Sequence, residues 1–196
     1  MTVLKHFPLV LSLLIPVTLG LQGCSNVISL FKEEPIETDE GKRSTGSWID
    51  DEIIETKALV NLDKADPALA QAHISATSFN GVILLTGQVP SEELRQLAGA
   101  TASKINKVRQ VHNEIAVSGT ISLVARSNDG WISTKVKSKL LADHSVRGSR
   151  IKVVTENGVV YLMGLVTRDE ADRAADVARK SNGVQKVVRI FEYIQS

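Results

Sequence analysis

The 196-residue sequence is poor in the residue types on which metal sites and disulfide frameworks depend. It holds one cysteine and four histidines. Beyond the N-terminal segment the histidines are His73, His112 and His144, and no two of them have the short spacing of metal ligands. A lone cysteine leaves no partner for an internal disulfide. We therefore expect no metal site, no cofactor and no disulfide framework.

The chain also lacks the usual arrangements of catalytic groups. We find no nucleophile accompanied by a base. The adjacent carboxylates Glu92–Glu93 and Asp169–Glu170 fall in the first turns of predicted helices, where negative charge favours the helix dipole. The Asn-Gly pairs at Asn80 and Asn157 are not followed directly by helix N-termini, so they are turns rather than phosphate loops. The sequence predicts a protein that is not an enzyme.

Long apolar runs are missing except at the N-terminus. There a basic start precedes LVLSLLIPVTLGL, which Pro16 interrupts and which is short for a membrane span. This pattern predicts a signal peptide over residues 1–23. Its end, Leu21-Gln22-Gly23-Cys24, resembles a bacterial lipobox, which implies cleavage before Cys24 and lipid on that cysteine. Ser25, rather than Asp, follows and resembles the outer-membrane sorting class. The alternative is an ordinary thiol after a plain signal peptide.

Charge of neither sign dominates the chain, but its distribution is uneven. Residues 24–46 contain Pro and Gly without apolar periodicity and predict a flexible tether. Residues 47–117 hold 6 basic and 9 acidic residues, whereas residues 126–196 hold 13 basic and 8 acidic residues. We expect two domains over these ranges, with a linker at 118–125. Nucleic acid is not expected as the partner of the basic domain, because the chain carries an export signal and few aromatics.

The two predicted domains are copies of one another. Three matched blocks recur at offsets of 76 or 77 residues, and a Trp-Ile pair recurs at an offset of 83. If the Trp-Ile pairs correspond, the first copy carries about six extra residues around Asp63 to Leu69. The matched blocks are Trp48-Ile49 with Trp131-Ile132, Asn80-Gly81-Val82 with Asn157-Gly158-Val159, Leu85-Thr86-Gly87-Gln88-Val89 with Leu162-Met163-Gly164-Leu165-Val166, and the Val-x-x-Val pairs that begin at Val108 and Val184. Such ordered self-similarity predicts a duplicated domain.

Each copy predicts the order helix, strand, strand, helix, strand. Apolar residues at 132, 136 and 140 form one helix stripe, and the Asn-Gly pairs favour type I′ hairpins. A capping box at Thr167 and Glu170 begins an alanine-rich helix in the second copy. We therefore expect an α+β fold with a three-stranded sheet covered on one face by two helices. Four glycines are expected to be structural: Gly87, Gly158, Gly164 and Gly183.

These features resemble the BON domain, a family of bacterial envelope modules. The resemblance rests on the opening helix in SNDGWISTKVKSKLL, the Asn-Gly hairpin, the Leu-x-Gly-x-Val strand, the Ala-rich helix and the Gly-Val-x-x-Val close. One departure is Lys107, which stands where the pattern has glycine before Val108. The resemblance implies phospholipid binding, envelope maintenance, and partners among envelope or division proteins.

A helical wheel places a candidate lipid-binding face opposite the Ile132, Val136 and Leu140 stripe. The outward residues are Trp131, Thr134, Ser138 and Leu141, flanked by Lys135 and Lys137. An outward Trp and Leu bordered by lysines is typical of a helix that lies in an anionic membrane interface. The opening helix of the first copy is acidic, so we expect anionic lipid to repel it.

Three alternatives remain open from the sequence. Trp131 near the helix start could pack against its own strands or against the first domain. The basic second domain could dock an acidic protein, as a periplasmic adaptor would. The two domains could also bind each other, so that lipid competes with a closed form.

Overall fold

The computed structural model describes residues 41, 43–119 and 123–195. The predicted signal peptide, Cys24 and the predicted tether as far as residue 40 lie outside the described residues. Within the described ranges, no helix is both long enough and apolar enough to cross a bilayer.

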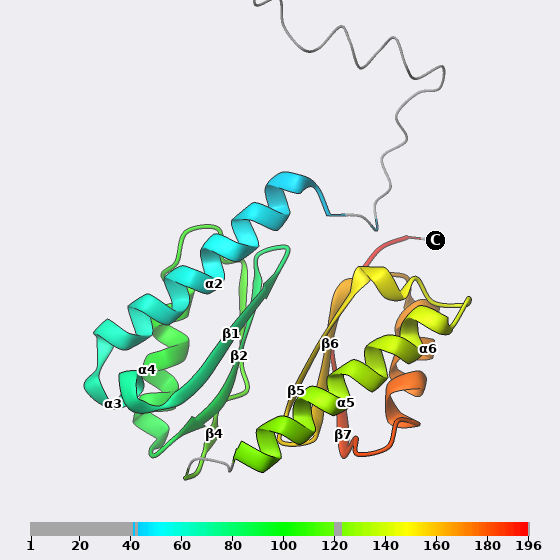
Figure 1. Cartoon of the computed structure of the whole chain (residues 1–196). Helices are drawn as coiled ribbons and strands as arrows, with labels where there is room; N and C mark the ends of the chain where they lie inside the picture. Colours follow the sequence, from blue (N-terminus) through cyan, green and yellow to red (C-terminus); the bar gives the residue numbers. More distant parts are fainter. Residues whose placement is uncertain (1–40, 42, 120–122, 196) are drawn as a thin grey trace, which may run out of the picture. The chain divides into compact units, whose positions relative to one another are not determined.

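The first domain is an antiparallel hairpin and a parallel third strand, covered by helices (Figure 1). Strand β2 lies in the middle, antiparallel to β1 and parallel to β3. A two-residue strand, β4, also pairs with β2, so this sheet has one strand more than the sequence predicts. The elements are α2 (Thr45–Ala65), α3 (Pro67–Gln71), β1 (His73–Phe79), β2 (Val82–Val89), α4 (Glu92–Ser103), β3 (Gln110–Asn113) and β4 (Ala116–Val117).

The second domain repeats this order with a three-stranded sheet, β5-β6-β7, in which β6 and β7 are parallel. Its first helix, α5, begins at Leu123, inside the segment expected to be linker. The capping box predicted at Thr167 and Glu170 is present at the start of α6. The elements are α5 (Leu123–Ala142), η1 (Gly148–Arg150), β5 (Ile151–Glu156), β6 (Val159–Val166), α6 (Arg168–Arg179) and β7 (Lys186–Tyr193).

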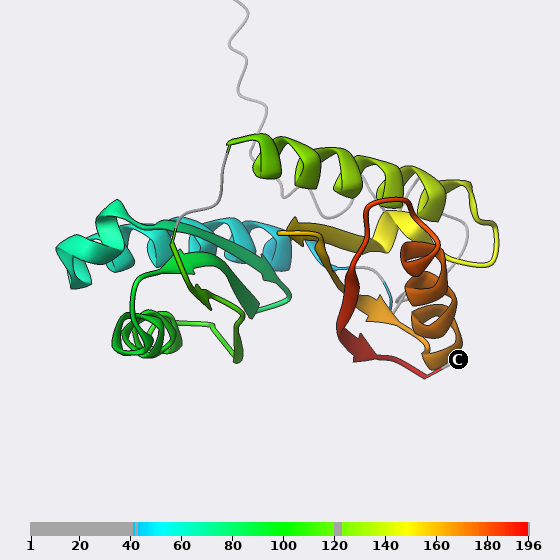
Figure 2. The ribbon, with the colours of Figure 1, turned by 90° about the horizontal axis from the view of Figure 1, so that it is seen from below.

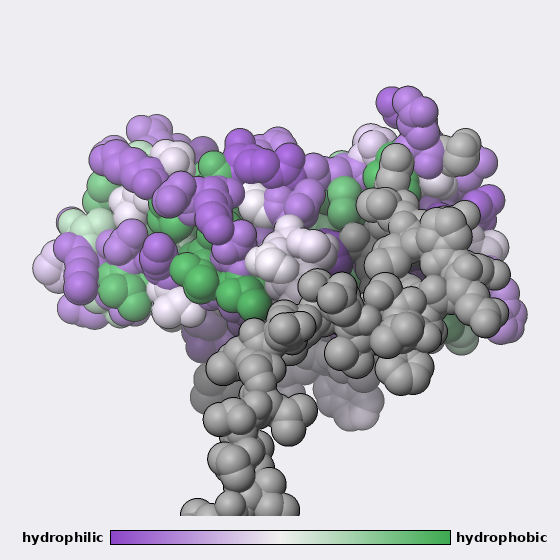
Figure 3. Space-filling view, turned by 90° about the horizontal axis from the view of Figure 1, so that it is seen from above, coloured by the Kyte–Doolittle hydropathy of each residue, from purple (hydrophilic) through white to green (hydrophobic). Residues whose placement is uncertain are grey.

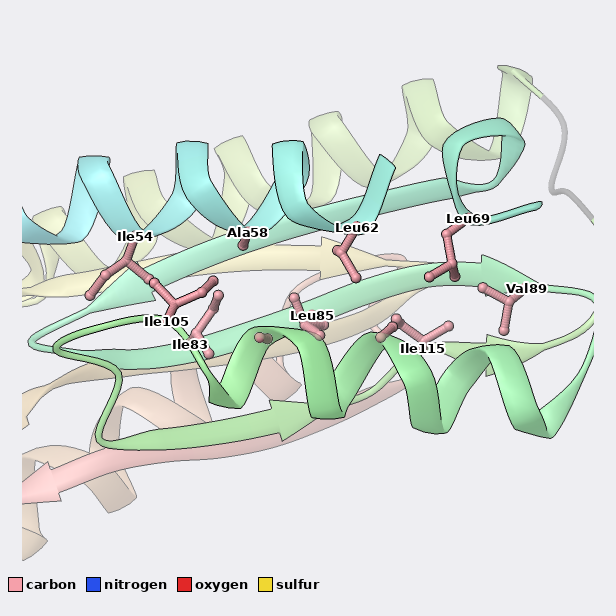
Figure 4. Close-up of a cluster of buried hydrophobic side chains, with 11 residues drawn as sticks. Ile54, Ala58, Leu62, Leu69, Ile83, Leu85, Val89, Ile105 and Ile115 are labelled. Carbon is pink, nitrogen blue, oxygen red and sulfur yellow. The ribbon is translucent and has the colours of Figure 1, made fainter. Parts of the chain in front are cut away.

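Each domain has its core between its helices and one face of its sheet. In the first domain, Ile54, Ala58 and Leu62 of α2 point at Ile83 and Leu85 of β2 (Figure 4). In the second domain the predicted stripe of α5 is fully buried against β6 and α6; it consists of Ile132, Val136 and Leu140. Alanines of α4 and α6 are buried in the same clusters, because a small side chain lets the helix approach the sheet closely. The predicted α+β architecture is confirmed.

The structure corrects the register of the repeat within the opening helices. Ile54 and Ile132 occupy the same core position, at an offset of 78 residues. Trp48-Ile49 therefore does not correspond to Trp131-Ile132: Ile49 is 48% exposed, whereas Ile132 is buried. The residue equivalent to Trp131 is Ile53. Because the offset falls only from 78 to 77 before the first strand, the first copy has one extra residue there, not about six.

A buried aspartate in each opening helix holds the Asn-Gly turn of the same domain. Asp51 accepts hydrogen bonds from the amides of Asn80, at 2.7 Å, and Gly81, at 2.9 Å. Asp129 accepts the matching amides of the second turn, from Asn157 at 2.7 Å and from Gly158 at 2.8 Å. The Asn-Gly turns were predictable from sequence, but the helix residue that secures each turn was not.

Asp51 also binds the Ser78 hydroxyl at 2.7 Å and the Arg43 guanidinium at 2.6 Å. Burial alone would raise the pKa of Asp51, but the hydrogen bonds from the Gly81 amide, Ser78, the Asn80 amide and Arg43 together lower it below its ordinary value. The carboxylate is therefore held in its charged form. The acidity of α2 that the sequence shows is thus partly internal and structural.

The predicted structural glycines lie where a side chain would collide or strain the backbone. A Cβ at Gly87 would lie 1.9 Å from the His73 carbonyl oxygen, and one at Gly164 would lie 2.9 Å from that of Arg150. His73 is the first residue of β1, and Arg150 is the last residue of η1, directly before β5. Gly158 and Gly183 have positive φ angles of 75° and 95°. Lys107 has φ of 72° in the first copy, so a lysine adopts the turn in which the second copy has Gly183.

The sheet faces that the helices leave free share a third apolar cluster. It contains Phe79, Val82 and Leu84 from the first domain and Tyr161, Met163 and Ile190 from the second. Burial raises the pKa of Tyr161 to about 12. Polar contacts border this cluster: Gln88 binds Glu156 at 2.6 Å, Lys152 binds Glu55 at 2.7 Å, and Arg109 binds Glu192 at 2.5 Å. The domains therefore contact each other chiefly through apolar strands, and α2 contributes Glu55.

Candidate membrane-binding site

Helix α5 is fixed to its domain along one side only. Besides its buried stripe, Ser133 donates a hydrogen bond to Thr155 of β5 at 2.8 Å, and Asp129 holds the hairpin. The opposite side faces away from the other described elements (Figure 2). The helical wheel predicts that the stripe of Ile132, Val136 and Leu140 is buried and that the opposite side of α5 is exposed, and both predictions are confirmed.

The outward side carries large apolar residues in contact with solvent. Trp131 is 65% exposed and Leu141 is 56% exposed. Thr134 and Ser138 lie exposed between them. The Thr134 hydroxyl donates to the Gly130 carbonyl at 2.9 Å, which satisfies it within the helix. The alternative in which Trp131 packs against its own strands or against the first domain is not what the structure shows. Contact between the domains leaves this side of α5 open.

Sequence reasoning missed one residue of this side. Val124 lies two helical turns before Trp131 and is 79% exposed. On the helical wheel it points in nearly the same direction as Trp131. Val124 lies in the segment that the sequence predicts to be linker, whereas the structure places it in α5. The seven-residue spacing between Val124 and Trp131 was the available signal. We define the α5 outer face as Val124, Trp131, Thr134, Ser138 and Leu141.

The lysines beside the α5 outer face differ in their contacts. Lys135 donates to the Asn182 carbonyl at 3.1 Å, and Lys139 donates to the Lys180 carbonyl at 3.1 Å, so both ammonium groups lie at the C-terminal end of α6. Lys137 is exposed, and no described carboxylate forms an ion pair with it. Of the two predicted flanking lysines, Lys137 is thus free to meet a ligand, and Lys135 is shared with α6.

The electrostatic character of α5 contrasts with that of α2. Helix α5 has four basic residues and a single acid, Asp129, which is buried. Helix α2 has five acidic and two basic residues. An anionic surface would therefore attract α5 more strongly than α2. The α5 outer face can insert apolar groups beside positive charge without bringing an exposed carboxylate with it.

The titratable residues elsewhere in the described part of the chain have structural contacts or no metal-binding arrangement. In the described ranges, no group of three His, Cys, Asp or Glu residues could hold a metal ion. Burial lowers the pKa of His112, which favours its neutral imidazole. The acidic pair Asp169–Glu170 serves the start of α6, as predicted. The Glu170 carboxylate accepts a hydrogen bond from the Thr167 amide at 3.0 Å and one from the Arg147 guanidinium at 2.7 Å.

The chain has relatives of known name. It is 39% identical over 184 residues to "Outer membrane lipoprotein DolP" of Haemophilus influenzae. The matched region covers 94% of this chain and 95% of that protein. It is also 39% identical over 153 residues to a "21 kDa hemolysin" of Actinobacillus pleuropneumoniae, which covers 78% of this chain and 79% of that protein. "Osmotically-inducible protein Y" of Escherichia coli is 30% identical over 157 residues, with 77% of this chain and 76% of that protein covered.

The sequence pattern of the BON domain matches residues 50–119 and again residues 128–195. The two matches begin 78 residues apart, which is the offset that the buried isoleucines and the paired aspartates give. The predicted division of the chain into a tether, two domains and a linker stays a prediction in its detail. With two such matches over most of its length, the chain belongs to the BON-domain family and carries two copies of the domain.

Proposed function

We propose that this chain is an outer-membrane lipoprotein whose second BON domain binds anionic phospholipid through the α5 outer face. In this proposal Cys24 carries the lipid, the domains face the periplasm, and the role is non-enzymatic. The name of the Haemophilus relative and its near full-length match support the location. Envelope integrity and maintenance at the division site are the processes that we expect this binding to support.

The observation that carries the proposal is the exposure of Trp131 and Leu141 on a helix without exposed acids. Fully burying a large apolar side chain contributes ~1.5–3 kcal/mol, so partial burial of this pair is worth ~2–4 kcal/mol. Each lysine near an anionic surface adds ~1 kcal/mol. The sum corresponds to a dissociation constant near the millimolar range or somewhat tighter. Such weak, reversible binding suits a domain that a lipid anchor already keeps beside the membrane.

A rival function is a periplasmic adaptor whose basic second domain docks an acidic protein. It uses the same lysines but makes no use of lipid headgroups. Flotation of the chain from residue 24, with Cys24→Ala to remove the anchor, distinguishes the two. We expect cofloating with phosphatidylglycerol vesicles and little with purely zwitterionic vesicles. Absence of binding to both vesicle types would favour the adaptor.

A further inference from the structure

The opening helix of the first domain exposes an apolar surface that the lipid-binding proposal does not use. We define the α2 outer face as Trp48, Ile49, Ile53 and Val60, whose exposed fractions lie between 44% and 52%. Ile49, Ile53 and Val60 are spaced by four and seven residues, so they lie on one side of α2, opposite Ile54, Ala58 and Leu62. In the space-filling view, hydrophobic residues (green) interrupt the hydrophilic surface over the first domain (Figure 3).

The α2 outer face is hollowed as well as apolar. A shallow hollow runs beside Trp48, Ile49 and Ile53, and Glu52, Thr56 and Lys57 complete its lining. Isolated exposed apolar residues are normal, but a contiguous group rimmed by polar residues marks an interaction surface. Tryptophan is also one of the side chains that contribute most to binding at protein interfaces.

The charges around this face indicate the chemistry of its occupant. Three acidic residues of α2 already have partners. Asp51 accepts hydrogen bonds from the hairpin amides. Asp50 forms an ion pair with Lys107, and Glu55 forms one with Lys152. Glu52 and Asp63 remain exposed along one edge of the face, and Lys57 lies along the other edge. Carboxylates at that edge repel anionic lipid and attract lysine or arginine.

We propose that the α2 outer face docks a partner protein through an amphipathic segment that presents apolar side chains flanked by basic residues. Apolar anchors fill the hollow beside Ile53, and basic side chains lie along Glu52 and Asp63. The proposal is independent of lipid binding by α5, because it concerns the other domain and the opposite charge. The duplicated helices have thus diverged toward a membrane in one copy and a protein in the other.

The two tryptophans make a direct test feasible. In the chain from residue 24 with Cys24→Ala and Trp131→Phe, Trp48 is the only tryptophan and reports on this face. The probes are two synthetic helical peptides with the same leucine stripe, one flanked by lysines and the other by glutamates. We expect the lysine peptide to shift Trp48 emission to shorter wavelength, with binding that weakens as salt rises. The glutamate peptide should leave the emission unchanged.

Matched substitutions decide whether the face itself binds. Ile53→Ser and Glu52→Lys should each weaken lysine-peptide binding about tenfold, the equivalent of losing about 1.4 kcal/mol. Leu97→Ser serves as the control, since Leu97 is an exposed leucine on α4 of the same domain. Equal binding of both peptides, no shift with either, or binding that Ile53→Ser leaves intact would overturn the proposal.

Two further measurements separate other occupants. If sedimentation shows self-association that Ile53→Ser abolishes, the occupant is a second copy of this chain and the proposal is wrong. A shift of Trp48 emission with phosphatidylglycerol vesicles would likewise assign the face to lipid. We expect a monomer and no vesicle-induced shift.

Discussion

The aspartates that join the opening helices to the Asn-Gly turns make a sharp prediction about stability. In Asp129→Ala, the amides of Asn157 and Gly158 lose a carboxylate acceptor at 2.7 and 2.8 Å. Asn157 is exposed and can bond to water, but Gly158 is buried, so its N–H is left without a partner. Hydrogen bonds to charged groups contribute ~1.5–3 kcal/mol each, and one of the two is largely replaced by water. We expect a loss of about 2–3 kcal/mol.

Thermal unfolding followed by circular dichroism measures this loss. For a chain of this size, 2–3 kcal/mol lowers the melting temperature by about 5–10 °C. Asp51→Ala should cost at least as much, because Asp51 accepts from Ser78 and Arg43 as well as from the two turn amides. The control is Asp176→Ala, which removes an exposed i,i+3 pair with Arg179 and should change stability by at most about 0.5 kcal/mol. If Asp129→Ala melts like Asp176→Ala, the turn does not depend on the aspartate.

Three other predictions concern acid stability, strand packing and anchoring. The pKa of Glu170 is lowered to about 2: burial would raise it, but hydrogen bonds and charge from Arg147 and the Thr167 amide outweigh that effect. The ionised Glu170 side chain stabilises the fold by at most ~3 kcal/mol; this contribution is complete above the unfolded pKa and is lost as pH falls through about 2. The free energy of unfolding of Glu170→Gln should therefore fall less steeply than that of wild type between about pH 5 and 2. Equal slopes for the two proteins would contradict this. Gly164→Glu should unfold the second domain, because a Cβ would lie 2.9 Å from the Arg150 carbonyl oxygen and a charge would be buried; an unchanged melting curve would refute it. Cys24→Ala should release the protein from outer membranes on cell fractionation, and unchanged sedimentation with membranes would exclude the lipid anchor.

Local signals in the sequence predicted most of each domain. The Asn-Gly turns have positive φ at both residues, Asn80 and Gly81 among them, because few residue pairs other than Asn-Gly and its relatives tolerate that geometry. The buried stripe of α5 was equally clear, since apolar residues recurred every four positions against a polar background. The exposure of Trp131 followed from that stripe by geometry alone.

The register of the opening helices could not be read from matching letters. The Trp-Ile dipeptides at Trp48 and Trp131 coincide in identity but not in position, and burial rather than identity defines equivalence in a helix. Asp51 and Asp129 show the true register. From the sequence alone, however, an aspartate on a helix is predicted to be exposed to solvent, and its hydrogen-bond partners are not known. A strand such as β2, which is apolar on both faces, is predicted to be buried on both faces. The sequence does not identify which residues pack against the second face. Here the second face meets Tyr161 and its neighbours.

The corrected register supplies the matched control for the lipid-binding site. Ile53 is the residue of the first domain that is equivalent to Trp131, and it is 44% exposed on an acidic helix. Ile53→Glu and Trp131→Glu therefore make the same change at the same position of two homologous helices. Trp48→Glu, although no longer the equivalent change, should also leave vesicle binding nearly untouched.

The most direct test of the account is the binding of Trp131→Glu, Ile53→Glu and wild type to phosphatidylglycerol vesicles, with the folded state of each confirmed by its melting curve. We predict that Trp131→Glu abolishes binding while its melting temperature stays near that of wild type, and that Ile53→Glu binds like wild type. Leu141→Glu should act like Trp131→Glu, and loss of binding by reversal of Lys137 should depend on salt. Ile132→Glu should instead unfold the second domain, because Ile132 is fully buried. Wild-type binding by folded Trp131→Glu, or an equal loss in Ile53→Glu, would contradict the assignment of lipid binding to the α5 outer face.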